Sequence, residues 1–203
     1  MYSNSDLIKH LIDRDALKSE IIIDAFRQID RIDFVPDPTG SDVYEDHPLS
    51  IGFQQTISQP TTVAMMLEML FPGKGEKILD IGSGSGWTTA LLSYIAGETG
   101  YVIGLERIKT LVEFGKGNLD KYNFQNAEII PAGKALGLPG ETFDRILVSA
   151  SADEFPADLT SQLKTGGKLV IPVLDSIYEI TKKENGELDG LRHYGFTFVP
   201  LIF

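Results

Sequence analysis

The sequence predicts an α/β fold with a mainly parallel sheet, helices on both of its faces and an antiparallel hairpin at its C-terminal end. From residue 77 onward, short apolar segments alternate with helical patterns. This alternation is typical of parallel strands and the helices that cover them. The tail instead has two strand-like segments separated by Asn185-Gly186 and Asp189-Gly190, which favour a hairpin.

The first part of the chain is expected to be helical. Apolar stripes at helical spacing are formed by Leu7, Ile8, Leu11 and Ile12, and by Ile22, Ala25, Phe26 and Ile29. The second helix must end before Pro36 and Pro38, because proline removes a helical hydrogen bond and restricts the residue before it. A polar loop containing Gly40 is expected over residues 37–48, and a third helix over 61–71.

The alternating pattern from residue 77 onward predicts the remaining strands and helices. Strands are predicted over residues 77–81, 101–105, 127–130, 145–149 and 168–172. Helices are predicted over residues 87–96, 110–122 and 157–163. The strands of the terminal hairpin are predicted over residues 177–182 and 193–201.

A glycine-rich turn joins strand 77–81 to helix 87–96 and carries the main functional signal. Glycine at 82, 84 and 86 removes side chains, so free amides and the helix N-terminus can bind a polar or anionic group. Glu106 ends the next strand, 26 positions after Asp80 (106 − 80). An acid at this point accepts ribose hydroxyls. The sequence therefore predicts a site for an adenosine-containing cofactor.

The turn itself favours one cofactor class. The dinucleotide fingerprint has its third glycine where this chain has Trp87, which disfavours a nicotinamide oxidoreductase. An acid followed by G-x-G-x-G resembles the first motif of S-adenosylmethionine-dependent methyltransferases. A tight strand–helix connection without any ligand is the alternative.

The composition of the chain disfavours several kinds of site and partner. The absence of cysteine excludes disulfides and thiolate sites, and the three histidines are too scattered to indicate a metal site. The net charge of −11 disfavours nucleic acid as a partner. No apolar run is long enough to span a membrane, and the N-terminus is not a secretory signal, so a cytoplasmic location is the default expectation. The oligomeric state is left open.

The segment over residues 50–60 is uncharged and rich in hydroxyl and amide side chains. Such a segment can present the hydroxyls of Thr56 and Ser58 to an anionic substrate. Alternatively, Ser58 only caps the helix that follows Pro60.

Four segments of the chain resemble the protein-L-isoaspartate O-methyltransferase family. They are FVPDPTGSDVYEDHPLSIGFQQTISQP, ILDIGSGSGWTTA, DRILVSASADEFPADLTSQLKTGGKLVIPV and the terminal FVPL. The resemblance runs from about Leu7 to Leu201. It implies the Rossmann-like methyltransferase fold, with residues 1–75 as an N-terminal addition packed on a core of 76–203. It also implies methylation of the α-carboxyl group of isoaspartyl residues in damaged proteins or peptides, which begins their repair.

The resemblance also implies roles for individual residues. Ser58 matches the active-site hydroxyl. The cofactor-binding positions are Gln55, Thr56, Ile57, Ser58, Asp80, Gly82, Ser83, Gly84, Glu106, Arg107, Ala132 and Gly133. The substrate positions are Asp46, Ser58, Val199, Pro200 and Leu201.

One position departs from the family pattern. Family members have an aspartate facing the adenine amino group where this chain has Ala132, and the loop over residues 134–141 is one residue shorter. Loss of one hydrogen bond should weaken the cofactor site without abolishing it. The departure keeps two alternatives open: a carboxyl methyltransferase for one dedicated peptide, and a cofactor-binding protein without turnover.

Overall fold

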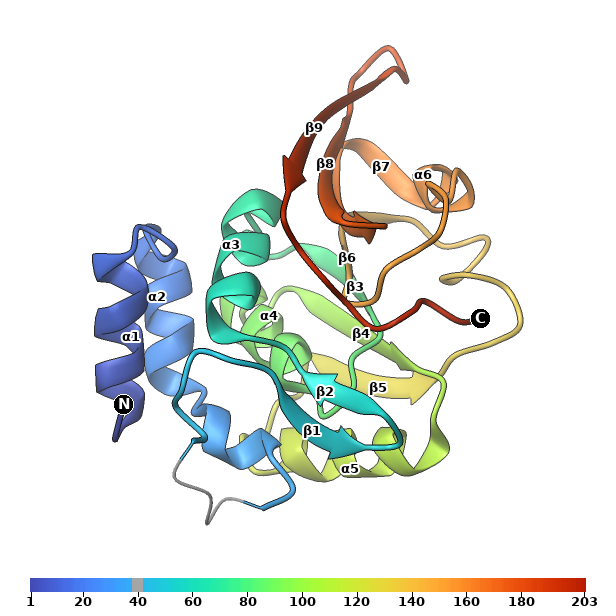
Figure 1. Cartoon of the computed structure of the whole chain (residues 1–203). Coiled ribbons are helices and arrows are strands. Elements are labelled where there is room, and N and C mark those ends of the chain that lie inside the picture. The colour runs from blue at the N-terminus through green and yellow to red at the C-terminus, as the bar shows by residue number, and fades with distance from the viewer. Residues whose placement is uncertain (38–41) are drawn as a thin grey trace.

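The computed structural model describes residues 1–37 and 42–203 and confirms the predicted fold class (Figure 1). Within this part of the chain, seven strands form one sheet in the order β5-β4-β3-β6-β7-β8-β9. Strands β3 to β7 run parallel, whereas β8 and β9 are antiparallel. The strands are β3 (Lys77–Ile81), β4 (Tyr101–Glu106), β5 (Ala127–Pro131), β6 (Phe143–Val148), β7 (Leu163–Val173), β8 (Ser176–Lys182) and β9 (Leu188–Tyr194). Pro38 and Gly40 of the predicted polar loop lie outside the described residues.

The predicted helices are present. They are α1 (Asn4–Asp13), α2 (Glu20–Gln28), α3 (Pro60–Leu70), α4 (Trp87–Ala96), α5 (Lys109–Asp120) and α6 (Asp158–Ser161), with a short 3-10 helix η1 (Arg31–Phe34) after α2. The Ser3 hydroxyl caps α1 by accepting the Asp6 N–H. Pro60 begins α3, where its missing N–H costs no helical hydrogen bond, and Phe71 ends it in a left-handed conformation.

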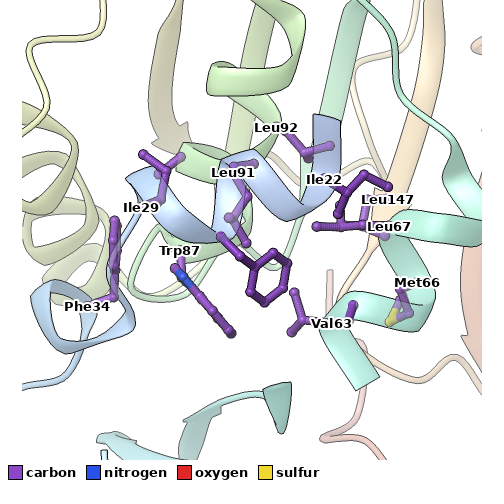
Figure 2. Close-up of a cluster of buried hydrophobic side chains, with 14 of the residues drawn as sticks. Ile22, Ile29, Phe34, Val63, Met66, Leu67, Trp87, Leu91, Leu92 and Leu147 are labelled. Carbon is purple, nitrogen blue, oxygen red and sulfur yellow. The ribbon is translucent and has the colours of Figure 1, made fainter. Parts of the chain in front are cut away.

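Helices α1 to α5 share one core cluster with one face of the sheet. Trp87 lies in this cluster with Val63 and Leu91 (Figure 2). The Phe26 ring packs edge-on against Trp87, with ring centroids 5.5 Å apart. The other face is covered by α6 and by loops, which contribute Leu136 and Leu159 to a second cluster. Apolar residues alternate between the two clusters along each strand, as Ile78 and Leu79 do.

The C-terminal hairpin forms, but the predicted second strand over residues 193–201 is wrong. Its second strand is β9, with Lys182 paired to Leu188 and Ser176 to Tyr194. Asp189-Gly190, predicted as part of the connection, lies inside β9. A Cβ at Gly190 would come 2.7 Å from the Ile180 side chain, so glycine here lets β9 pack closely against β8 and does not form a turn.

Two further differences concern local structure. Helix α6 is shorter than the predicted 157–163, because β7 already begins at Leu163. A small hairpin of β1 (Leu49–Gly52) and β2 (Gln55–Ile57) follows the predicted polar loop, where no strands were predicted. Its two tip residues, Phe53 and Gln54, have φ of 54° and 59°, a left-handed conformation that side chains seldom adopt.

The topology determines where ligands can bind. The chain goes from β3 to β4 and β5 on one side and returns to β6 and β7 on the other. Ligands of such sheets bind at the carboxyl ends of the strands beside this switch point. After β9 the chain crosses the same edge (Figure 1), where Ser151 accepts the Leu201 N–H and donates its own N–H to Val199.

Candidate functional site

Three clefts meet at the carboxyl edge of the sheet. The acid-side cleft spans about 490 Å³, including space open to solvent, and is lined by Gln55, Glu106, Arg107, Ala132, Leu136 and Leu201, among others. The glycine-turn cleft spans about 320 Å³ on the same measure and is lined by Thr56, Ser58, Gly82, Ser83, Trp87 and Ser149, among others. The outer cleft spans about 1220 Å³ and is lined by Thr56, Ser58, Thr62, Ser149, Phe198 and Val199, among others.

Shared lining residues show how the clefts connect. Gly82 lines both the acid-side cleft and the glycine-turn cleft. Thr56, Ser58 and Ser149 line both the glycine-turn cleft and the outer cleft. A ligand in the first two clefts would therefore meet a ligand in the third beside three hydroxyl groups.

Glycine is required in the turn because the backbone is closely surrounded. A Cβ at Gly84 would come 3.2 Å from Ile51 of β1, and one at Gly86 would come 3.0 Å from Ile129 of β5. Both residues also have positive φ, of 55° and 90°. The Asn118 side chain of α5 donates to the Ser85 carbonyl at 2.9 Å, which fixes the turn from below.

The prediction of free amides in the turn is wrong for its main positions. The N–H groups of Gly82 and Ser83 both donate to the Leu105 carbonyl, and the Gly86 N–H donates to the Ser83 carbonyl. The Gly84 N–H donates to the Glu106 carboxylate at 3.0 Å. Most of these amides are already hydrogen-bonded because β4, which supplies Leu105 and Glu106, runs directly beside the turn.

Two buried side-chain atoms beside the glycine turn have no hydrogen-bond partner within the described residues. They are Ser83 Oγ and Trp87 Nε1, and both residues line the glycine-turn cleft. Buried polar atoms are rarely left unpaired. This pair fits a ligand with a polar end beside the glycine turn.

Asp80 lies beneath the turn and not in a cleft. Its carboxylate is fully buried and accepts hydrogen bonds from the Thr88 and Thr89 hydroxyls, both at 2.7 Å. Burial raises the pKa of Asp80 to about 6, with a smaller contribution from the charge of Glu106, while the threonine hydroxyls oppose the shift. Asp80 therefore joins β3 to the first turn of α4.

Glu106 stands at the junction of the acid-side cleft and the turn. It is 6% exposed, and its carboxylate accepts the Gly84 N–H and, at 2.8 Å, the Ile108 N–H. Beyond it the cleft wall is apolar, with Ala132 and Leu136. An acid followed by an apolar wall fits a ribose carrying a flat, weakly polar base.

Ser58 is half-buried and follows β2 directly. The interpretation of Ser58 as a helix cap is not supported, because the Asp46 carboxylate accepts the Thr61 N–H at the start of α3, at 2.9 Å, and the Thr61 hydroxyl, at 2.7 Å. The Ser58 hydroxyl is therefore not needed for α3. Asp46 lines none of the three clefts.

The hydrogen bonds to Asp46 also affect its ionisation. Burial would raise the pKa of this carboxyl, but the contacts from Thr61 and Gln59, together with the charge of His10, outweigh burial and hold the pKa below its ordinary value. Asp46 is therefore charged at the N-terminus of α3, where a negative charge is favourable.

Arg31 is a functional candidate that sequence reasoning missed. Its side chain is completely buried, and it donates to the carbonyls of Ser58 at 2.7 Å and His47 at 3.1 Å. The guanidinium carbon lies 5.0 Å from the centre of the Trp87 ring. Burial lowers the pKa of Arg31 to about 10, and the charge of Asp46 opposes this shift. Arg31 thus connects the Ser58 segment to the start of α4.

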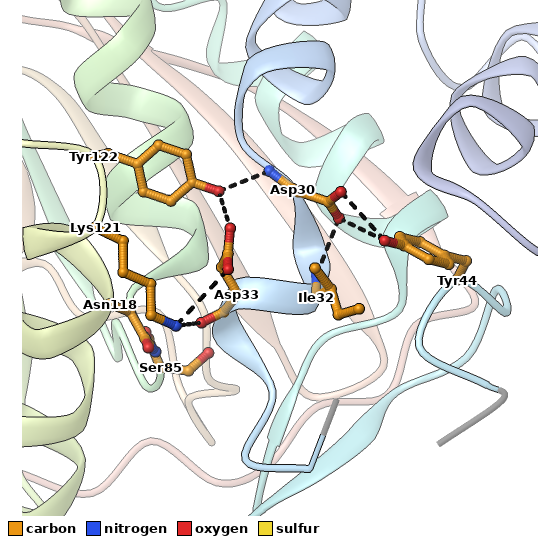
Figure 3. Close-up of polar contacts among 8 residues, drawn as sticks. All are labelled: Asp30, Ile32, Asp33, Tyr44, Ser85, Asn118, Lys121 and Tyr122. Carbon is orange, nitrogen blue, oxygen red and sulfur yellow. Dashed lines mark hydrogen bonds and ion pairs between the residues drawn. The ribbon is translucent and has the colours of Figure 1, made fainter. Parts of the chain in front are cut away.

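A polar network holds η1, and therefore Arg31, in place (Figure 3). The Tyr122 hydroxyl accepts the Asp30 N–H at 3.0 Å and donates to the Asp33 carboxylate at 2.7 Å. The Tyr44 hydroxyl donates to the Asp30 carboxylate at 3.0 Å. Lys121 donates to the Asp33 carbonyl at 2.5 Å. The contacts of Lys121 and Tyr122 attach η1 to the residues after α5, and Tyr44 attaches the start of η1 to the segment before β1.

The structure brings most of the predicted site residues together. Every one of them lines at least one of the clefts except Asp46, Asp80 and Gly133. Pro200 and Leu201 line the acid-side cleft, whereas Val199 lines the outer cleft. Ser149 was predicted only to lie at a strand end, and its position between two clefts was not expected. Within the described residues, no helix has the length and apolar character needed to cross a membrane.

Comparison with known proteins gives consistent results. The family model described as protein-L-isoaspartate(D-aspartate) O-methyltransferase matches residues 2–202. The chain is 39% identical over 202 residues to the protein-L-isoaspartate O-methyltransferase of Methanopyrus kandleri, covering 97% of this chain and 89% of that one. It is 41% identical to the enzyme of the same name from Pyrococcus horikoshii, covering 92% and 86%.

The same similarity holds in three dimensions. A protein-L-isoaspartate O-methyltransferase from Plasmodium falciparum, solved in complex with S-adenosyl-L-homocysteine, matches with a TM-score of 0.88 and 30% identity. The match covers 100% of this chain and 99% of that one. The resemblance predicted from the motifs is thereby confirmed.

Proposed function

The chain belongs to the protein-L-isoaspartate(D-aspartate) O-methyltransferase family, and on this basis we propose that it methylates the α-carboxylate of isoaspartyl residues in damaged proteins and peptides. The methyl donor is S-adenosylmethionine, in keeping with the S-adenosyl-L-homocysteine bound by the Plasmodium falciparum relative. The observation that carries the proposal is the connection of the three clefts: the acid-side cleft joins the glycine-turn cleft at Gly82, and the glycine-turn cleft joins the outer cleft at Thr56, Ser58 and Ser149. Methylation of this carboxylate begins the repair of the damaged peptide bond.

The cofactor would be held along the first two clefts. Glu106 would accept the ribose hydroxyls, and Ala132 and Leu136 would pack against the adenine. The unpartnered Ser83 Oγ and Trp87 Nε1 would bind the amino-acid end. The cofactor supplies an electrophilic methyl group on a sulfonium, and the connection through Gly82 would direct that group toward the three hydroxyls.

The peptide would occupy the outer cleft between the Ser58 segment and the chain around Val199. An α-carboxylate, with a pKa of roughly 3.5, is already an anionic nucleophile at neutral pH. The enzyme therefore needs no strong base, only placement of the carboxylate in line with the methyl group. Such placement is worth about 7–11 kcal/mol in favourable cases. Ser58 and Ser149, which line both the glycine-turn cleft and the outer cleft, would hold one carboxylate oxygen each.

Ala132 would affect affinity more than chemistry. With alanine at this position, the adenine amino group would lack a carboxylate acceptor from the end of β5. A lost hydrogen bond to a neutral amine costs about 0.5–1.5 kcal/mol, a fewfold to tenfold in affinity. The site would therefore bind the cofactor more weakly and still turn over.

The decisive assay is transfer of labelled methyl from S-adenosylmethionine to a synthetic peptide containing isoaspartate, beside its normal aspartyl twin. Labelling of the isoaspartyl peptide alone supports the proposal, and labelling of several unrelated isoaspartyl sequences supports general repair. Labelling of one sequence only would indicate a dedicated substrate. No labelling of any isoaspartyl peptide, with S-adenosyl-L-homocysteine binding intact, would indicate a cofactor-binding protein and refute the proposal.

A further inference from the structure

The loop after β5, residues 132–142, forms a wall of the acid-side cleft but contains no helix or strand. The residues of this loop that line the cleft are Ala132, Ala135, Leu136 and Gly137. At the start of the loop, the Ala132 N–H donates to the Glu106 carbonyl at 2.9 Å. A segment without regular structure is ordered only where more rigid elements hold it, so its remaining contacts determine how well this wall is formed.

The side chain of Gln162 ties the middle of this loop to the core. Gln162 lies between α6 and β7 and is 2% exposed. Its Oε1 accepts the Leu138 N–H at 2.7 Å, and its Nε2 donates to the Leu136 carbonyl at 2.9 Å. Within the part of the chain that the structure describes, no other hydrogen bond joins residues 133–138 to another element. One amide group therefore holds the loop on both sides of Gly137.

Gly137 leaves the space that this amide occupies. Its φ is 73°, in the left-handed region that favours glycine. A Cβ at this position would come 2.3 Å from Gln162 Oε1, much closer than two such atoms can approach. Glycine at 137 is therefore required for the loop to close over the Gln162 amide.

Leu136 extends the effect of this contact to the cleft. Its side chain is almost completely buried and belongs to the second core cluster, together with Leu159 and Leu163. The same residue lines the acid-side cleft, whereas Gln162 lines none of the three clefts. The apolar wall of the cleft is thus held in position by a residue that lies behind it.

We propose that Gln162 is a positioning residue for the adenine of the cofactor. This inference rests on the proposed function, in which Ala132 and Leu136 pack against the adenine. A gap of about 1 Å between two apolar surfaces forfeits up to about half of their dispersion attraction, so the wall must stand at contact distance before the base arrives. Because residue 132 is alanine and offers no carboxylate, packing against this wall makes up a larger share of adenine binding.

The variant Gln162→Met tests this role, because methionine fills the same space but makes neither hydrogen bond. Leu136 would then have to be ordered as the ligand binds. The affinity for S-adenosyl-L-homocysteine, measured by calorimetry, should therefore fall by about threefold to tenfold. The affinity for methylthioadenosine, which has the adenine and ribose without the amino-acid end, should fall by the same factor.

Steady-state kinetics separate positioning from a general loss of structure. In Gln162→Met the KM for S-adenosylmethionine should rise, whereas kcat and the KM for an isoaspartyl peptide at saturating cofactor should stay the same. The matched control is Gln125→Met, which changes an exposed glutamine before β5, at the opposite edge of the sheet. This control should leave both ligand affinities and all kinetic constants unchanged.

Gly137→Ala disturbs the same contact from the side of the loop and leaves Gln162 in place. It should reproduce the loss of affinity for both ligands. Because the two substitutions act on one contact, the double variant should bind no more weakly than the weaker single variant, and the two effects should not add. If Gln162→Met does not fold, Gly137→Ala decides the question together with Gln162→Glu, which keeps the size and the acceptor for the Leu138 N–H.

Three results would overturn the inference: unchanged affinity for both ligands, a loss for S-adenosyl-L-homocysteine but not for methylthioadenosine, or a fall in kcat with an unchanged KM for S-adenosylmethionine. Failure of the proposed function would look different. In that case the wild type would bind S-adenosyl-L-homocysteine and label no isoaspartyl peptide, while calorimetry would still report the role of Gln162 in binding.

Discussion

Replacement of Arg31 by methionine tests whether a buried cation positions the Ser58 segment. Methionine keeps the length and apolar stem but removes the charge and all donors. The Ser58 and His47 carbonyls would then lose the guanidinium as their donor, and Trp87 would lose its cationic neighbour. We expect both stability and turnover to fall.

The magnitude follows from these contacts. Two hydrogen bonds from a charged donor are worth about 3–6 kcal/mol together, and a desolvated cation–π contact is worth about 2 kcal/mol. Burial of the charge opposes them: lowering the pKa of Arg31 from 12.5 to about 10 corresponds to a cost of about 3 kcal/mol. Arg31→Met should therefore lower the free energy of unfolding by about 2–5 kcal/mol. Displacement of Ser58 by about 1 Å would also reduce kcat by about a hundredfold.

Urea unfolding and steady-state kinetics on an isoaspartyl peptide measure these two effects. The matched control is Arg27→Met, which removes an exposed arginine 2.6 Å from Asp24 and should change stability by less than about 0.5 kcal/mol. Arg31→Lys keeps a charge but not the two-pronged geometry, so it should fold and retain intermediate activity. If Arg31→Met behaves like Arg27→Met in both measurements, the argument for a positioning role is refuted.

Four further outcomes are expected. Ser58→Ala should reduce turnover much more than affinity for S-adenosyl-L-homocysteine measured by calorimetry, and unchanged turnover would remove Ser58 from the mechanism. Glu106→Gln should weaken that affinity about tenfold or more, because hydrogen bonds to a charged acceptor are worth about 1.5–3 kcal/mol; equal affinity would mean that the ribose lies elsewhere. Ala132→Asp should tighten binding by a fewfold to tenfold, and a neutral result would show that the adenine is held by other groups. Asp80 binds its proton more tightly when folded, with its pKa raised from 3.8 to about 6, so its contribution to stability is present below pH 3.8 and is lost as the pH rises through about 6. The stability difference between the wild type and Asp80→Asn should therefore shift by about 3 kcal/mol across this window, and a constant difference would contradict a buried, titrating Asp80.

The parts of the fold that local chemistry determines could be predicted from the sequence. Helix α4 and strand β3 have the predicted bounds, because the glycine turn between them allows only one kind of connection. Glu106 was predicted to stand beside the turn because parallel strands place consecutive acids at one edge, and the structure has it there. The resemblance added the segment around Ser58, which local patterns alone left between two interpretations.

The missed features depend on contacts between distant parts of the chain. Arg31 looks like an ordinary surface arginine in the sequence, and its burial depends on α4 and on the Ser58 segment. The β1–β2 hairpin has Phe53 and Gln54 at its tip, where sequence rules expect asparagine or glycine. The start of β9 was misjudged because Asp189-Gly190 is also a turn signal, and only packing against Ile180 shows its actual use.

The chain after β9 forms a wall of two clefts at once. Gly195 to Val199 line the outer cleft, Pro200 to Phe203 line the acid-side cleft, and Ser151 holds the segment at the boundary between them. A bulky peptide that pushes this wall outward must also alter the wall of the neighbouring cleft. The two binding equilibria are then thermodynamically linked, so each ligand changes the affinity of the other by the same factor. Binding of either ligand would therefore affect the binding of the other through this one stretch of backbone.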